Sequence, residues 1–584
     1  MWLWRLAFAA LLAGCASGEI GDGPDASRAD SGGTYAGGDA DVRSLDPDDA
    51  GQLPALDAGK ADAALPMDAG MPPLDAGPPP PPKPPVTFDP PPRGFSSPFM
   101  LTLTAGDKDA VLHYTLDGSV PTASSPTVSG PLSIAVTTLV RVIAVENGAS
   151  SPVFNASYFE LDASLSSFSS NLPLLVVHMR GGAAPQPSSR EYVPGMLGVF
   201  TPGSSRSMLA GPAEHTSRMG IKIRGRSTRM SDKPSYTMEL WGRTDEDAPA
   251  PLLGMPEDGD WVLYAPYDWD KSMLHNAFAY DLSRKIGRYA PRTQFVELFL
   301  VSGTSQKLGM ANYAGVYVLT ERLTRSASRV PIRKLEPADV ADPARSGGYI
   351  LKVDEPDMMS EAFSAAGLTF VYVDPDVDEI APEQKQYIAD YLNACKRAAA
   401  ASDGKDPMTG KHYSELMDVP SFIDHHILSM LLKNPDAFAL SSYFHKDRDG
   451  KLQAGPLWDF DLGMGAVDPW GNRSLDPKYW GPNTSATMFR RSFWNPLFTH
   501  SEFSAAYWAR WDELLGSTFE SAKFRATIDA WEQQLMEAEQ RNRTRWPKSA
   551  PRHDSYPDEI EALEAWLDAR LVWIKANKGV TPPP

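Results

Sequence analysis

The segment that most constrains the fold is residues 421–465, in which a helix, a break, a hairpin and two aspartates follow one another. Apolar residues recur at helical spacing over residues 422–430, and this spacing predicts a helix. The helix should end near residues 433–435, because the residue before Pro435 is pushed away from helical dihedral angles. Asp436 follows this break directly.

Two short strands, residues 442–445 and 452–457, are expected to form a hairpin around a turn that contains Gly450. The second strand runs into Asp459. Because a hairpin folds back on itself, we expect Asp436 and Asp459 to meet at one of its ends. Phosphoryl transfer uses such a pair: one carboxylate orients the attacking hydroxyl and the other holds Mg²⁺ against the phosphates. Two unrelated loop aspartates are the simpler alternative.

Three stretches of this segment resemble the CotH kinase family, the atypical protein kinases of the spore-coat-protein-H type. They are residues 431–436 (LLKNPD), 443–447 (YFHKD) and 455–462 (GPLWDFDL). The resemblance extends from about residue 172 to about residue 574. In the order of a protein kinase, residues 434–436 stand where His-Arg-Asp would, and residues 459–461 stand where Asp-Phe-Gly would.

This resemblance implies an exported kinase that moves the γ-phosphoryl group of ATP, with Mg²⁺ or Mn²⁺, to a Ser, Thr or Tyr hydroxyl of an extracytoplasmic protein. On this basis Asp436 would be the catalytic base, Asp459 a metal ligand and Asp461 a further metal ligand. Ser441 stands where the protein-kinase loop places a metal-binding Asn. A hydroxyl is a weaker ligand, which argues against a second metal site.

Basic residues upstream are expected to hold the phosphates. A strand at residues 220–227 closes on a loop with Arg224 and Arg226, and a second strand, residues 233–240, begins with Lys233. The resemblance implies that this Arg-Gly-x-Ser turn and the following lysine face the nucleotide. Guanidinium groups and an ammonium group are suited to phosphate contact. Without the resemblance, a solvated basic face is the better explanation.

Two further strands end in acids. Residues 347–354 include Lys352, which is a second candidate for phosphate contact. A protein kinase pairs its lysine with a helix glutamate, but the predicted helix at residues 271–286, capped by Asp270, contains none. Glu321, at the end of another strand, is the substitute that we expect. It can equally lie between two lobes or simply occupy the strand end.

Residues 1–15 resemble a bacterial lipoprotein signal. Their apolar run of about ten residues is too short to span a bilayer. The last four residues, Leu-Ala-Gly-Cys, resemble a lipobox, which implies that Cys15 becomes a lipid anchor; an ordinary signal peptide with a chance cysteine is the alternative. Ala16 resembles the residue of lipoproteins that reach the outer membrane. We therefore expect an envelope protein that faces the periplasm or the cell surface.

A tether and a small β-module are expected next. Residues 16–87 are rich in Asp, Ala, Gly and Pro, a composition that predicts disorder. Alternating apolar residues in 88–161 predict a small antiparallel sandwich. Residues 114–122 resemble the chitobiase/β-hexosaminidase C-terminal module, which implies an immunoglobulin-like fold. Its expected role is that of a spacer, with contact to cell-wall glycan as the alternative.

The whole chain is therefore expected to be multidomain, since 584 residues exceed one compact domain. After the tether and sandwich, residues 171–576 are expected to form an α+β, protein-kinase-like domain of two lobes with a helical C-terminal part. A disordered tail, residues 577–584, would follow. Within the larger domain, residues 467–493 occupy the place of an activation segment and are expected to supply part of the substrate groove.

Composition excludes several classes of function. The formal net charge of −19 argues against nucleic-acid binding, which needs clustered Lys and Arg. With Cys15 and Cys395 as the two cysteines, neither a disulfide framework nor a Cys-based zinc site is expected, and Cys395 should be buried in a helix at residues 382–401. The adjacent pair His425-His426 faces different sides of a helix, which favours core or surface roles over metal binding.

Two rival functions remain at this point. The first is a catalytically idle, kinase-shaped surface protein that grips a glycan or an envelope protein. The second is a glycoside hydrolase, which needs two carboxylates that flank a sugar cleft. Asp436 and Asp459 could be spaced suitably, but nothing around them in the sequence indicates a carbohydrate site, so this function ranks last.

Overall fold

The computed structural model describes residues 86–580, apart from 204, 227, 305–306, 357–360, 472 and 482–486, together with residue 582. The expected signal peptide, its Cys15 and nearly all of the tether lie outside the described residues. Within the part of the chain that is described, no helix combines the length and the apolar character that crossing a bilayer requires.

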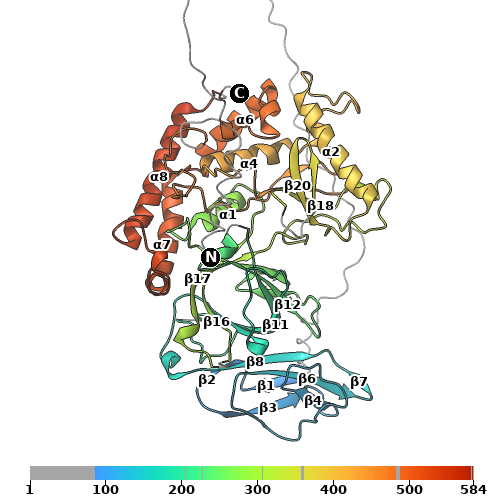
Figure 1. The fold of residues 1–584 in the computed structure, drawn as a ribbon, viewed down its shortest axis with the longest axis vertical. Helices are drawn as coiled ribbons and strands as arrows, with labels where there is room; N and C mark the ends of the chain where they lie inside the picture. Colours follow the sequence, from blue (N-terminus) through green and yellow to red (C-terminus); the bar gives the residue numbers. More distant parts are fainter. Residues whose placement is uncertain are drawn as a thin grey trace, which may run out of the picture. The chain divides into compact units, whose positions relative to one another are not determined.

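The first described region is a β-module of two sheets (Figure 1). One sheet has the order β1-β3-β5 and the other the order β2-β8-β6-β4, with β7 beside β6. The strands are β1 Val86–Asp89, β2 Arg93–Phe95, β3 Phe99–Ala105, β4 Val111–Thr115, β5 Leu132–Ile134, β6 Thr138–Glu146, β7 Ala149–Ser150 and β8 Phe154–Glu160. Side chains from both sheets, among them Leu101 and Val140, share one buried core, as in a sandwich. The sheets are not purely antiparallel, because β2 and β8 run parallel.

A closed barrel follows, with the strand order β10-β11-β12-β15-β17-β16-β9. Its strands are β9 Leu174–Met179, β10 Val193–Phe200, β11 His215–Ile223, β12 Tyr236–Trp241, β15 Asp260–Tyr264, β16 Thr293–Val301 and β17 Tyr313–Glu321, and the pair β13 Ala250–Leu252 and β14 Met255–Asp258 stands beside it. Parallel pairing of β9 with β16 closes the barrel. Alternate side chains point inward, such as Leu175 and Val177 on β9, and fill the interior.

The remaining region combines a five-stranded sheet with the α-helices (Figure 1). The sheet has the order β19-β20-β18-β21-β22, and its strands are β18 Tyr349–Val353, β19 Ala362–Ala365, β20 Leu368–Asp374, β21 Ser442–Lys446 and β22 Gln453–Ala454. The helices are α1 His275–Lys285, α2 Pro382–Ala400, α3 Tyr413–Leu416, α4 Val419–Leu431, α5 Trp494–Leu497, α6 Ser501–Leu515, α7 Ser521–Arg545 and α8 Tyr556–Asn577. One large apolar core joins them, and Cys395 on α2 is fully buried in it.

Two helix boundaries differ from the sequence prediction. The predicted start of α1 near residue 271 is wrong, because Met273 has a φ of 66° and the helix begins at His275. Asp270 still acts on the helix start, since its carboxylate accepts a hydrogen bond from the His275 N–H at 2.8 Å. The helix before Asp436 ends at Leu431 as expected near the break, but it begins at Val419, where the Asp418 side chain caps it.

An ion pair with a buried carboxylate joins the barrel to α7. The Glu297 carboxylate on β16 is fully buried, and Arg541 of α7 contacts both of its oxygens at 2.6 and 2.8 Å. The Tyr313 hydroxyl donates to the same carboxylate. Removing the guanidinium would therefore leave an unpaired charge in the interior.

We expect the substitution Arg541→Met to lower the free energy of unfolding by about 3 kcal/mol, because a buried carboxylate loses its counter-charge. Lys523→Met is the control on the same helix, because its side chain is 56% exposed and its partner Glu520 is 44% exposed. Urea unfolding followed by circular dichroism measures both. Equal losses for the two variants would show that the Arg541–Glu297 pair adds nothing.

Candidate active site

The loop after α4 places Asp436. Helical geometry stops at Lys433, whose φ is 49°, and the Lys433 ammonium donates to the carbonyl oxygens of Asp476 and Lys478 at 2.6 and 2.7 Å. The Asn434 side chain then bridges the two predicted site loops. Its oxygen accepts from the Asp436 N–H at 3.2 Å, and its Nδ2 donates to the Asp459 carbonyl at 3.0 Å.

Asp459 is held from the other side by α1. Its N–H donates to the Tyr280 hydroxyl at 3.1 Å, and the next N–H, of Phe460, donates to the Asn276 side-chain oxygen at 2.7 Å. The Ser441 hydroxyl donates to Asp459 Oδ2 at 3.0 Å. Asp459 has a φ of 65°, a left-handed conformation that non-glycine residues adopt at a cost. These three contacts, together with the Asn434 hydrogen bond to the Asp459 carbonyl, offset that strain.

Asp461 lies two residues further and is 8% exposed. Within the described residues, no hydrogen-bond donor or cation contacts its carboxylate. Burial raises the pKa of Asp461 well above its usual range, and the charges of Asp459, Asp270 and Asp436 raise it further. Burial also raises the pKa of Asp459, the charge of Asp436 adds to this effect, and the Ser441 hydrogen bond opposes it. A cation would relieve both carboxylates.

Two basic residues predicted for the nucleotide site, Arg224 and Lys352, have different partners. The Arg224 guanidinium lies over the Trp458 ring, 4.9 Å from its centroid. Burial lowers the pKa of Arg224, and the negative charge of Asp459 is among the groups that counter this effect. Lys352 on β18 contacts Asp354 at 2.8 Å. Burial lowers the pKa of Lys352, but the nearby Tyr443 and Asp354 outweigh it, so the net shift is upward.

Two arginines that sequence reasoning missed bind the Asp436 loop. Arg473 Nη1 contacts Asp436 Oδ1 at 2.8 Å, and the same guanidinium contacts Asp468 at 3.4 Å. Arg491 donates to the carbonyl oxygens of Pro435 and Ala437, on either side of Asp436. Both arginines belong to residues 467–493, where the sequence carries no local signal that links them to Asp436.

Three residues predicted for the nucleotide site have partners elsewhere in the structure. Lys233 is 1% exposed, and its ammonium donates to the Val316 carbonyl at 2.5 Å and to the Asn542 side chain at 3.0 Å. Burial lowers its pKa well below the usual range, and no carboxylate counters this. A phosphate contact would require both hydrogen bonds to break.

Glu321 and Arg226 also have other partners. The fully buried Glu321 carboxylate accepts from Arg292 at 2.6 Å and from the Tyr289 hydroxyl at 3.1 Å. It therefore does not pair with Lys233 and serves the end of β17 instead. Arg226 is exposed and forms an ion pair with the equally exposed Glu355.

The described residues contain no ready-made cluster of three or more His, Cys, Asp or Glu side chains that could hold a metal ion. His426 lies in the core between the Tyr507 hydroxyl and the Phe489 carbonyl, each at 2.9 Å. Asp459 and Asp461 nevertheless fit a magnesium-like cation, because such ions are commonly held by one or two carboxylates while water and substrate phosphates complete the shell.

Two sequence models of known families match parts of the chain. The sequence model of the family described as CotH kinase protein matches residues 221–574, and the model described as chitobiase/beta-hexosaminidase C-terminal domain matches residues 90–155. No curated protein is similar enough to the chain to count as a match. The first match spans more than half of the chain and includes every carboxylate of the candidate site. The chain therefore belongs to the CotH kinase protein family.

Proposed function

We propose that the chain is an active atypical protein kinase that phosphorylates hydroxyl groups of envelope proteins. The observation that carries this proposal is the direct link between the two aspartate loops: the Asn434 side chain bonds both, and Ser441 bonds the Asp459 carboxylate. On this proposal the barrel and the helical region act as the two lobes of a kinase, and the nucleotide lies between Arg224 and Asp459.

Each side chain has one role in the proposed reaction. Asp436 accepts the proton of the acceptor hydroxyl, whose oxygen forms a bond to the γ-phosphorus of ATP while the bond from that phosphorus to ADP breaks. Asp459 and Asp461 would hold a divalent cation, which offsets the negative charge of the phosphates. Arg224 would supply positive charge at the phosphate oxygens, and Lys352 would have to release Asp354 to do the same.

The N-terminal sequence supports the place of action that we propose. The resemblance of residues 12–15 to a lipobox supports an outer-membrane anchor at Cys15. The long tether would let the folded domains reach proteins at a distance from that anchor. We propose that the acceptors are proteins of the envelope. The β-module would space the kinase from the membrane or touch cell-wall glycan.

Transfer of labelled phosphate from ATP to a generic acceptor protein, in the presence of Mn²⁺, tests the catalytic assignment. We expect Asp436→Asn and Asp459→Asn each to lower the rate by about 10³-fold, since one removes the base and the other a metal ligand. The exposed Asp376→Asn is the control and should keep full activity.

An idle kinase-shaped protein would give a different pattern. It would transfer no label, and neither ATP nor Mn²⁺ would raise its melting temperature. Label transfer that survives both aspartate substitutions would instead show that other residues catalyse the reaction.

The raised pKa of Asp461 predicts a pH dependence of metal binding. A metal must displace the proton that the metal-free carboxyl holds, so affinity for Mn²⁺ should rise with pH, by at most about tenfold per unit for one proton, and level off above the pKa. Asp461→Asn should weaken binding and flatten the profile. Titration calorimetry between about pH 5 and about pH 8 measures both. An equally steep profile in the variant would exclude Asp461.

Arg473 is expected to position Asp436 without touching the nucleotide. Arg473→Gln should lower kcat by about tenfold to a hundredfold and leave the KM for ATP unchanged, and Arg473→Lys should restore part of kcat because it keeps the charge. Arg448→Gln is the matched control: its arginine is 21% exposed and paired with Asp339, against 20% for Arg473. A change in KM alone would contradict this role.

A further inference from the structure

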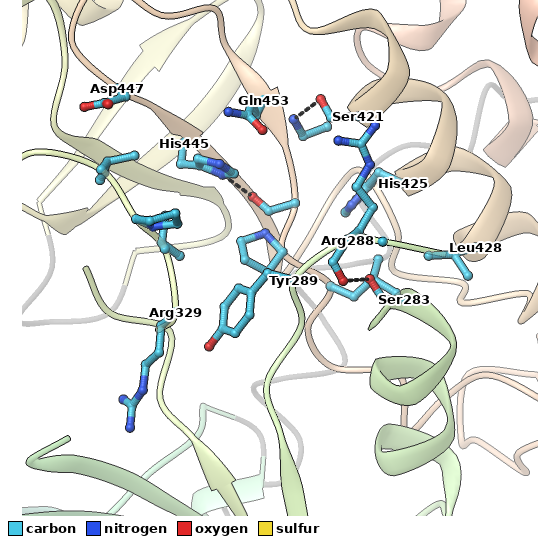
Figure 2. Close-up of a pocket in the computed structure, with 18 residues that line it drawn as sticks. Ser283, Arg288, Tyr289, Arg329, Ser421, His425, Leu428, His445, Asp447 and Gln453 are labelled. Carbon is cyan, nitrogen blue, oxygen red and sulfur yellow. Dashed lines mark hydrogen bonds between the residues drawn. The ribbon is translucent and has the colours of Figure 1, made fainter. Parts of the chain in front are cut away.

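The structure contains a cavity of about 300 Å³ that none of the three site aspartates lines (Figure 2). This volume is at the lower end of the range for small-molecule sites. Four segments line it: the end of α1 with the loop after it, residues 329–332, α4, and the β21–β22 hairpin with residues 455–457. None of the residues assigned above to phosphoryl transfer is among its lining residues.

His425 of α4 is the group in this cavity whose chemistry is least explained by the fold. It is 6% exposed, and its Nδ1 is buried with no hydrogen-bond partner among the described residues. The ring is fixed in place, because it stacks on Trp494 with an angle of 18° between the ring planes. Burial lowers the pKa of His425 to about 4, so the imidazole is neutral at pH 7. A fixed, neutral nitrogen that lacks a partner is suited to a hydrogen bond from a ligand.

Other lining side chains add both donors and acceptors. His445 uses Nδ1 to bond the Gly455 carbonyl at 3.1 Å, which leaves its Nε2 for another partner. Gln453, labelled close to His445 in Figure 2, carries an amide that can donate and accept. Asp447 Oδ1 accepts a hydrogen bond from the Arg333 N–H at 2.9 Å. Hydroxyl groups, which donate and accept at once, match such a mixed lining.

The cations of the cavity are already neutralised. Arg288 contacts Asp424 at 2.7 Å and lies 3.8 Å from Asp418. Arg329 lies 3.2 Å from Asp258 and 4.0 Å from the buried Glu321. Asp424 also pairs with Arg510, and Glu321 also pairs with Arg292. The four carboxylates therefore balance four guanidinium groups, and the cavity offers no excess positive charge to a phosphate or a carboxylate ligand. The lining therefore favours an uncharged ligand.

Apolar side chains complete the walls and give the ligand an apolar face. They are Val330, Ile332, Leu428 and Leu457, which belong to three of the four lining segments. A ring that carries hydroxyl groups at its edge and C–H groups on its faces satisfies both kinds of wall at once. We propose that this cavity is a binding site for a neutral, polyhydroxylated ring of monosaccharide size.

Binding of D-glucose to the full chain tests the proposal, with D-glucuronate as the charged counterpart of the same ring. Saturation-transfer NMR detects contact, and titration gives the affinity. We expect glucose to bind and glucuronate to bind at least about tenfold more weakly, since no excess positive charge meets its carboxylate. Absence of glucose binding, or tighter binding of glucuronate, would overturn the proposal.

Substitutions then locate the site. His425→Phe keeps the aromatic stacking but removes the ring nitrogen, and should weaken glucose binding by about tenfold. His553→Phe, at an exposed histidine outside the cavity, is the matched control and should bind as the unchanged protein does. Gln453→Ala provides a second lining variant if circular dichroism shows that His425→Phe does not fold. Glucose binding that is equal in the lining variants and the control would place the sugar elsewhere and refute the site.

Discussion

The acidic residues Asp459, which is half-buried, and Asp461, which is buried, are the constraint on which the candidate site depends. Moving an ionised carboxylate out of water costs several kcal/mol unless a counter-charge or hydrogen bonds offset it. Ser441 supplies one hydrogen bond to Asp459, whereas Asp461 receives none within the described residues. The pair is therefore stable with a proton or with a cation, and the second state is the one that a phosphoryl-transfer enzyme needs.

The fold fixes this pair through elements that are far apart in the chain. Asn276 and Tyr280 of α1 bind the backbone at residues 459–460, and Asn434 binds it from the loop after α4. The β21–β22 hairpin connects that loop to Asp459. Helix α1 and the loop after α4 hold this backbone from both sides. The positions of the carboxylates are therefore set before substrate binds.

The sequence was sufficient to predict those elements that short stretches of residues determine. The break at Pro435, the hairpin and the two aspartate loops could be predicted because turn residues and helical spacing act over a few positions. The second hairpin strand is shorter than predicted, covering Gln453–Ala454 only, and ends where Pro456 has no N–H to give to the ladder. Strands β19 and β20 were not anticipated.

The basic residues could not be placed from sequence, because their partners are distant in the chain. The sequence around Lys233 predicts a phosphate ligand, but the Lys233 ammonium donates a hydrogen bond to the side chain of Asn542, which is 309 residues away in the chain. Glu321 pairs with Arg292, and Asp436 pairs with Arg473, which lies in the segment expected to act as an activation segment but which no sequence signal links to Asp436. Arg224 and Lys352 lie at or beside the ends of strands β11 and β18, and their contact with phosphate stays a prediction.

The most direct test of the account is the position of a bound metal. Crystals grown with Mn²⁺ and a non-hydrolysable ATP analogue can be measured at the manganese absorption edge, where the ion alone gives a strong anomalous peak. The account predicts a peak within about 2.5 Å of carboxylate oxygens of both Asp459 and Asp461, with phosphate oxygens on its other side. A nucleotide bound with its metal away from both aspartates would contradict it.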